Sequence, residues 1–240
     1  MDISTNMKEE VYPGEMINKY DLLLAEAYPE HYKLRIEVAE LLQGHLEKIE
    51  KAKIIDIGCG KGETLEYILK LLTNVEVVAI DIDEKMISGL EEHLREYIQN
   101  GQLTPVRQDI FEYIKGVESE SLDGITSSWT IHNFTKSERK KLLEEIFRTL
   151  KPGGIFVNMD KYVFDDPQKE KESLAAAIEN LKAVPDKEIS EIAIQHEEDD
   201  RHPDIIMKEQ ESAREMEQIG FRDIKFHSRV GRETVMACEK

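Results

Sequence analysis

Three glycines at alternate positions, Gly58, Gly60 and Gly62, lie directly after a short apolar run and directly before a segment with helical spacing. Glycine has no Cβ, so a loop of this kind turns tightly and lets a ligand approach the backbone closely. The helix that follows would direct its unpaired N–H groups at that ligand. The position three residues after Gly60 holds Glu63, where a dinucleotide-binding fingerprint requires glycine. The spacing therefore predicts a ligand-binding loop of another type.

Acidic residues end the next two predicted strands. Asp81 closes a β-branched run about twenty residues after the glycines, the spacing at which an acid meets ribose hydroxyls in such folds. A carboxylate accepts from two hydroxyls and would repel a 2′-phosphate. Asp83 is placed to cap the following helix. Asp109 ends the third strand, where its position also suits a helix cap.

A polar and aromatic loop follows a fourth predicted strand within residues 121–134. Its site candidates are Ser128, the single tryptophan Trp129, His132 and Asn133. Ligands of open parallel sheets bind beyond the carboxyl ends of the strands, and this loop lies at such an end. A histidine there could accept a substrate proton near neutral pH.

Alternating strands and helices are needed to bring these residues to one edge of a sheet. The apolar patterns predict strands that begin near residues 54, 75, 103, 122 and 151, with helices over 64–72, 84–98 and 136–150 between them. Residues 221–228 and 232–238 predict a closing hairpin. We expect an α/β fold: a Rossmann-like, seven-stranded, mostly parallel sheet whose last strand is antiparallel.

Two further helical regions stand outside the strand–helix alternation. Residues 13–27 and 31–49 have helical spacing and predict an N-terminal helical module over residues 1–50, laid over the ligand cleft. Residues 51–240 form the main domain, with an inserted helical cap at about 162–218 between strands 5 and 6. Within the cap, the acidic run 197–204 is expected to be a solvated, flexible joint.

The order of these motifs resembles the class I S-adenosylmethionine (SAM)-dependent methyltransferases. The resemblance spans about residues 54–238 and rests on the glycine loop, Asp81, Asp109, the 128–133 loop and a Lys-Pro-Gly-Gly turn at 151–154. It implies SAM as the cofactor and S-adenosylhomocysteine (SAH) as the product. The cofactor-binding residues that it implies are Tyr20, Asp56, Gly58, Cys59, Gly60, Gly62, Asp81, Ile82, Met86, Asp109, Ile110, Ser128 and Trp129.

Individual roles also follow from the resemblance. Tyr20 would close over SAM, and an apolar residue after strand 2 such as Ile82 would pack against adenine. Asp109 would accept a hydrogen bond from the adenine amino group with Ile110 against the ring, so both this role and the helix cap are open for Asp109. His132 would be either a catalytic residue or a structural one that packs the loop against the fifth strand.

Composition restricts the partners. The net charge of −18 repels phosphate backbones on average, which disfavours a nucleic-acid substrate and favours a small-molecule acceptor. The first residues lack an apolar signal region and no run is long enough to span a membrane, so we expect a cytoplasmic monomer or homodimer.

Cys59 and Cys238 are far apart in sequence, so they do not form a metal-ligand or redox pair in sequence. His196, Asp199, Asp200 and His202 are of metal-binding types, although a solvated loop explains them equally.

Two alternative functions remain open. Residues 27–32, 129–134 and 159–166 resemble carboxy-SAM synthase, which remodels SAM with prephenate and serves tRNA wobble modification. That family uses an arginine of the cap for the extra carboxylate, and Arg201 is the nearest candidate here. His132 stands where that family has glutamine. The other alternative is a SAM-binding protein without turnover.

Overall fold

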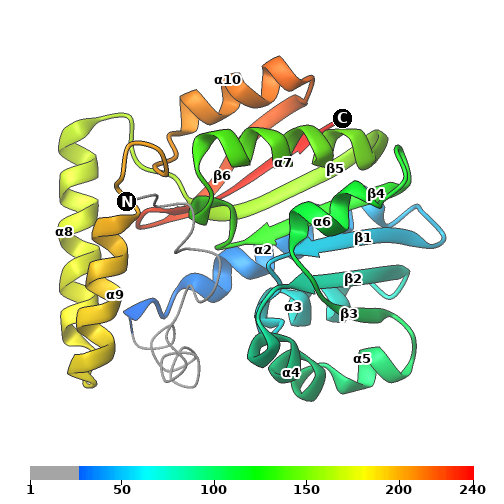
Figure 1. Ribbon diagram of the computed structural model, residues 1–240, viewed down its shortest axis with the longest axis horizontal. Coiled ribbons are helices and arrows are strands. Elements are labelled where there is room, and N and C mark those ends of the chain that lie inside the picture. Colours follow the sequence, from blue (N-terminus) through cyan, green and yellow to red (C-terminus); the bar gives the residue numbers. More distant parts are fainter. Residues whose placement is uncertain (1–26) are drawn as a thin grey trace.

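Seven strands form one sheet in the order β3-β2-β1-β4-β5-β7-β6 (Figure 1). The computed structural model describes residues 27–240, so most of the helix predicted over 13–27, and Tyr20, lie outside the described residues. The strands are β1 Ala52–Ile57, β2 Val75–Asp81, β3 Leu103–Arg107, β4 Leu122–Ser128, β5 Leu150–Lys161, β6 Arg222–Val230 and β7 Glu233–Glu239. β1 to β5 pair in parallel, and β7 runs antiparallel to both neighbours. The predicted mostly parallel sheet with an antiparallel last strand is confirmed.

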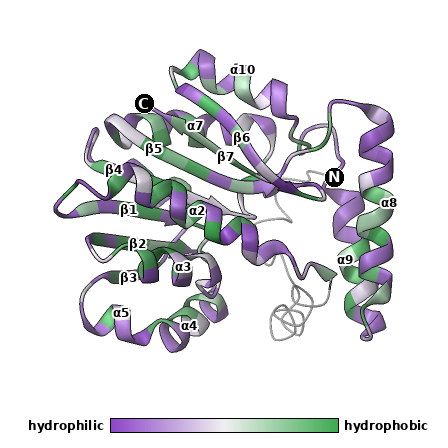
Figure 2. Ribbon diagram, turned by 180° about the vertical axis from the view of Figure 1, so that it is seen from behind, coloured by the Kyte–Doolittle hydropathy of each residue, from purple (hydrophilic) through white to green (hydrophobic). Residues whose placement is uncertain are grey.

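Helices cover both faces of the sheet. One face carries α2 His31–Leu46, α3 Glu63–Leu71 and α4 Glu84–His93, and the other carries α6 Ile110–Lys115, α7 Lys136–Thr149 and α10 Glu209–Ile219. Apolar residues concentrate along strands such as β2 and β5 (Figure 2). The single helix predicted over 84–98 is wrong, because Leu94 leaves helical geometry and α5 Arg95–Gln99 follows separately. No helix among the described residues has the length and apolar character that a membrane crossing requires.

Two helices inserted between β5 and β6 stand away from the sheet. They are α8 Pro167–Ala183 and α9 Lys187–Asp199, here called the α8–α9 hairpin. The hairpin lies beyond the ends of β1, β4 and β5, an edge here called the carboxyl edge (Figure 1). α8 begins at Pro167 because Asp166 caps it, accepting from the N–H groups of Gln168 and Lys169. Leu181, Val184, Ile189 and Ala193 form a small apolar core together with Ala27, which precedes α2.

Candidate functional site

The glycine loop joins β1 to α3 at the carboxyl edge. Gly58, Gly60 and Gly62 have φ values of 68°, 54° and 87°, in the left-handed region that favours glycine. A Cβ on Gly58 would lie 2.0 Å from Thr130 Oγ1, so packing inside the protein requires that glycine. Among residues 27–240, a Cβ on Gly60 would meet only Glu63 Oε2, at 3.7 Å. Gly60 therefore faces space into which a ligand can fit.

Asp81 holds the glycine loop from the end of β2. Its Oδ2 accepts from the Gly60 N–H at 3.0 Å, and its Oδ1 accepts from the Asp83 N–H at 2.9 Å. Burial raises the pKa of Asp81, while these two N–H groups act in the opposite direction. The next side chain, Ile82, is 50% exposed, although it is apolar. A carboxylate with remaining lone pairs thus lies beside an exposed apolar surface.

Asp56 is a buried acid near the end of β1, only 2% exposed. Its Oδ1 has no hydrogen-bond partner among the described residues. Burial raises the pKa of Asp56 to about 8, and the negative charges of Asp81 and Glu63 add to the effect. Three acids, Asp56, Glu63 and Asp81, therefore lie close together at the loop, and a ligand that carries positive charge would favour their ionised forms.

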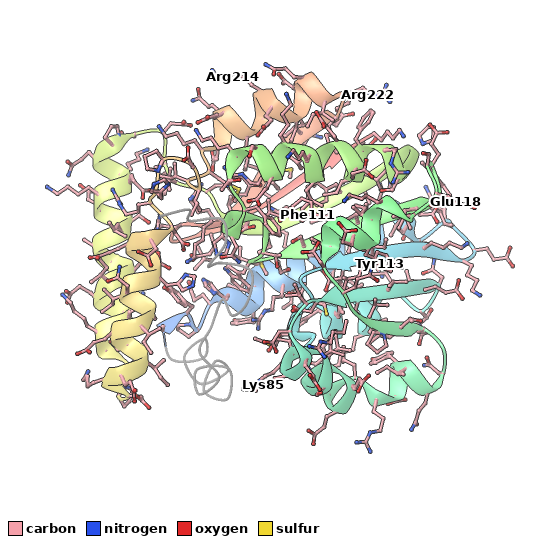
Figure 3. All side chains as sticks on the ribbon, viewed as in Figure 1. Lys85, Phe111, Tyr113, Glu118, Arg214 and Arg222 are labelled. Atoms are coloured by element: carbon pink, nitrogen blue, oxygen red, sulfur yellow. The ribbon has the colours of Figure 1, made fainter. Side chains whose placement is uncertain are left out.

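Asp109 caps α6. Its Oδ1 accepts from the N–H groups of Phe111, at 2.8 Å, and Glu112, at 3.2 Å. Capping the helix is one of the two roles that the sequence left open for Asp109, and Oδ2 takes no part in the cap. Phe111, labelled in Figure 3, packs edge-on against Phe134 with ring centroids 5.1 Å apart. Met86 and Ile110, two other predicted cofactor contacts, are buried.

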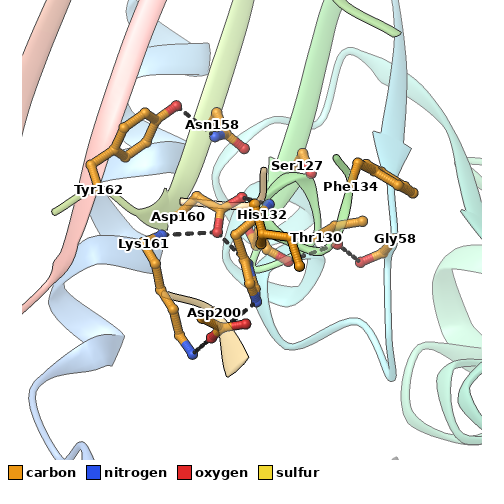
Figure 4. A network of polar contacts seen from close by, with 12 residues as sticks. Gly58, Ser127, Thr130, His132, Phe134, Asn158, Asp160, Lys161, Tyr162 and Asp200 are labelled. Atoms are coloured by element: carbon orange, nitrogen blue, oxygen red, sulfur yellow. Dashed lines mark hydrogen bonds and ion pairs between the residues drawn. The ribbon is translucent and has the colours of Figure 1, made fainter. Parts of the chain in front are cut away.

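His132 lies on a short 3-10 turn, Ile131–Asn133, after β4 and is buried. Its Nδ1 lies 2.6 Å from Asp160 Oδ1, and its Nε2 lies 4.0 Å from Asp200 Oδ2 (Figure 4). Burial disfavours the imidazolium, but Asp160 and Asp200 outweigh burial and raise the pKa of His132. A histidine between two carboxylates retains its proton and is poorly suited to accept another.

Lys161, at the end of β5, ties the α8–α9 hairpin to the sheet. Its Nζ lies 2.6 Å from Asp200 Oδ2 and 2.7 Å from Glu197 Oε1. Glu197 also pairs with buried Arg232, at 2.5 Å. Burial alone would raise the pKa values of both acids, yet Lys161 and neighbouring cations hold them below their usual ranges. The expectation of a solvated joint is wrong for Glu197 and Asp200, because these ion pairs bury them.

Trp129 follows β4 with a φ of 50°, unusual for a residue other than glycine. The backbone N–H of Trp129 donates to the Met159 carbonyl at 2.8 Å. The indole ring lies 4.8 Å from the His31 ring, and the Arg35 guanidinium lies 5.2 Å from its centroid. The ring therefore joins the N-terminal turns of α2 to the end of β4.

Cysteine and metal chemistry find little support in the geometry. Cys59 and Cys238 are both buried free thiols, and burial raises the pKa of each. Within residues 27–240, no three His, Cys, Asp or Glu side chains are grouped so that they could hold a metal ion. Asp200, one of the proposed metal ligands, is instead paired with Lys161.

The structure brings the predicted Asp56, Gly60, Asp81 and Trp129 to the same edge of the sheet. Asp160, Lys161 and Arg35 were not predicted from the sequence. Asp160 and Lys161 come directly after the buried run of β5, so polar residues at a strand end were a usable signal. Arg35 lies next to Leu34 and three residues before Val38, on the buried stripe of α2, where a cation is unusual.

A family model described as a methyltransferase domain matches residues 54–154. Carboxy-S-adenosyl-L-methionine synthase of Campylobacter fetus subsp. fetus is 23% identical over 159 residues, which cover 66% of this chain and 64% of that protein. The chain spans less than two thirds of the length of the curated relatives it matches. Residues 54–154, which match the methyltransferase domain model, include the glycine loop, Asp81, Asp109 and Trp129.

Solved structures share the fold at low identity. The CurJ carbon methyltransferase has a TM-score of 0.66 and 19% identity, covering 92% of this chain and 58% of that chain. A SAM-dependent methyltransferase from Aquifex aeolicus has a TM-score of 0.57 and 19% identity, covering 95% of this chain and 97% of that chain. The likeness extends over the sheet and the helices on both of its faces.

Proposed function

We propose that the chain, whose residues 54–154 match a methyltransferase domain, is a class I SAM-dependent methyltransferase that transfers a methyl group from SAM to a small-molecule acceptor. The observation that carries the proposal is the open space at Gly60, between the acids Asp56 and Asp81. SAM carries a sulfonium and an ammonium, so an acidic loop with room beside it is chemically matched to it.

Each residue around the loop has a role in this proposal. Asp81 accepts from the ribose hydroxyls, and exposed Ile82 packs against adenine. The free Oδ2 of Asp109 accepts from the adenine amino group while Oδ1 continues to cap α6. Asp56 receives the ammonium of the methionyl end. These assignments use Asp56 Oδ1, which has no partner among the described residues, and the exposed side chain of Ile82.

Methyl transfer needs little acid–base help from the protein. SAM supplies an activated methyl group when bound, leaving as SAH once the acceptor has taken the methyl. The chain's contribution is to align the acceptor with that methyl group and to exclude water. We assign His132 a positioning role, because its pKa is raised and both of its ring nitrogens face carboxylates. It connects the loop after β4 to the α8–α9 hairpin.

The proposal is tested with SAM labelled in its methyl group. Purified protein is incubated with labelled SAM and fractions of cellular small molecules, transfer RNA and protein. We expect label in one small-molecule fraction together with accumulation of SAH. Label in RNA or protein would contradict the small-molecule acceptor, and the absence of SAH in every fraction would contradict methyl transfer.

Carboxy-SAM synthesis is the second candidate, and the curated relatives favour it. It requires a cation for an added carboxylate, and two arginines near the hairpin are already engaged with acids. Arg201 lies 3.5 Å from Glu170, and Arg232 pairs with Glu197 and Glu170. Incubation with SAM and prephenate followed by mass spectrometry separates the two functions. A carboxylated SAM product would replace the leading proposal.

The wider organisation follows from the same proposal. Residues 1–50 act as the N-terminal module, and residues 51–240 act as the SAM-binding domain with its cap at about 162–218. The acceptor is held between the carboxyl edge and the α8–α9 hairpin. The protein works in the cytoplasm as a monomer or homodimer, without a nucleic-acid partner, in keeping with its charge of −18.

Replacing Lys161 with methionine is expected to loosen the α8–α9 hairpin. The change leaves Asp200 and Glu197 buried without their shared cation, which costs about 3–5 kcal/mol when one partner of a buried pair is lost. Hydrogen-exchange mass spectrometry should show faster exchange in α9 while the β1 amides stay protected.

Lys182→Met is the matched control, since Lys182 pairs with Glu179 on the exposed surface of α8. Exposed pairs contribute at most about 1 kcal/mol, so this variant should exchange like the wild type. Equal exchange of α9 in both variants would show that Lys161 does not hold the hairpin.

A further inference from the structure

Buried polar atoms without hydrogen-bond partners occur on the two side chains that contact the Trp129 ring and on the residue before it in sequence. Among the described residues they are Arg35 Nε, both ring nitrogens of His31, and Ser128 Oγ. Buried polar atoms are normally hydrogen-bonded, and an orphaned one calls for a water, an ion or a ligand. His31 Nε2 has an acid 3.4 Å away, Glu233 Oε2. Arg35 has no such neighbour within residues 27–240, so its positive charge is the uncompensated feature of the group.

An uncompensated guanidinium is unexpected in this chain. Acids outnumber Lys and Arg by 50 to 32. Arg229 and Arg232 each have a glutamate partner, and buried Arg139 donates to backbone carbonyls. Arg35 instead lies over Trp129, 5.2 Å from the ring centroid. The stacking holds the planar group in place and leaves its N–H donors available. Such a fork of donors matches the two oxygens of a carboxylate.

Trp129, on which Arg35 lies, is followed directly by a residue that contacts the glycine loop. Thr130, the next residue, donates from Oγ1 to the Gly58 carbonyl at 3.2 Å. Trp129 has a left-handed φ of 50°, a conformation that persists in residues other than glycine only where surrounding contacts impose it. The hydrogen bond from the backbone N–H of Trp129 to the Met159 carbonyl is one such contact. The chain thus holds the ring at a strained position next to the ligand loop.

We propose that Arg35, stacked on Trp129, binds a carboxylate of the ligand held at the glycine loop. The inference rests on the proposed function. Its chemistry complements that of Asp56, whose free Oδ1 suits an ammonium, so the two residues together match a zwitterionic amino-acid group. Two ligands can supply the carboxylate: the methionyl end of SAM, or an acceptor that carries its own carboxylate. Ser128 Oγ supplies a further donor in either case.

Arg35→Met and Arg35→Lys test the proposal by calorimetric titration with two probes. SAH carries the carboxylate, and 5′-methylthioadenosine lacks the whole amino-acid end. Methionine retains an apolar stem against Trp129, and lysine retains the charge. If the carboxylate is that of the cofactor, Arg35→Met weakens SAH at least tenfold and leaves 5′-methylthioadenosine unchanged, while Arg35→Lys is intermediate. Arg214→Met, on α10 at the top of Figure 3, is the control and should match the wild type.

A second titration distinguishes the acceptor as the source. Protein saturated with SAH is titrated with prephenate, a small carboxylated probe. Loss of prephenate binding in Arg35→Met with SAH affinity unchanged assigns the carboxylate to the acceptor. Equal weakening of SAH and 5′-methylthioadenosine, or no change with any probe, overturns the inference and leaves the proposed function intact. A wild type that binds neither SAH nor 5′-methylthioadenosine overturns both.

Discussion

Valine at position 60 is expected to abolish SAH binding while the protein remains folded. Within the described part of the chain, a Cβ on Gly60 meets only Glu63 Oε2, at 3.7 Å, so these residues leave room for a side chain. The proposed cofactor occupies that room, and a branched side chain would overlap it. We expect affinity to fall at least 100-fold, or about 3 kcal/mol, in calorimetric titration.

Gly101→Val is the matched control for backbone strain. Gly101 has a φ of 81° and nothing within 4 Å of an added Cβ, and it lies at the opposite edge of the sheet, before β3. Both variants should lose a similar stability, about 1–2 kcal/mol for a left-handed residue with a side chain. If the Gly60→Val variant bound SAH with wild-type affinity, this result would contradict the placement of the cofactor at the glycine loop.

Asp56→Asn is expected to stabilise the ligand-free protein and to weaken SAH binding. The folded protein raises the pKa of Asp56 to about 8, so ionising this buried acid opposes folding. Asparagine has nearly the same shape and no charge. Binding should fall about 10- to 100-fold, since losing a charged partner costs about 1–3 kcal/mol.

The gain in stability should depend on pH. Between the ordinary pKa of an aspartate and about 8, the folded protein retains a proton that the unfolded chain has lost, so wild-type stability falls as pH rises through that window. The Asp56→Asn substitution removes this dependence. Urea denaturation should therefore give a larger advantage for the variant at about pH 8.5 than at about pH 5. An equal or smaller advantage at the higher pH would contradict the assignment of a buried, proton-retaining Asp56.

Much of the fold was predictable because local signals agreed with one another. Apolar β-branched runs ended in acids or glycines, and the helical segments between them had one apolar face, which together specify a parallel sheet covered on both sides. The break at Leu94 was not predictable in this way. Its cause is tertiary: Leu94 is buried and lies where a Cβ on Gly62 would be 2.7 Å from its Cδ1.

The site was predictable only where the backbone dictates it. Gly60 and Asp81 follow from turn geometry and strand ends, and the structure joins them by a hydrogen bond. The burial of Glu197 and Asp200 depends on Lys161, which is 36 and 39 residues away in sequence, so composition alone suggested a solvated run. Arg35 was missed because its significance lies in an absent partner, which no sequence pattern records.

Calorimetric titration of the purified wild-type protein with SAH tests the central claim most directly. The account predicts one site per chain with a dissociation constant in the micromolar range, and a net release of protons near pH 7 as the ligand's ammonium favours ionised Asp56. Proton release is read from titrations in buffers of different ionisation enthalpy. The absence of heat at millimolar SAH, or binding without proton release, would contradict a SAM site at the acidic glycine loop.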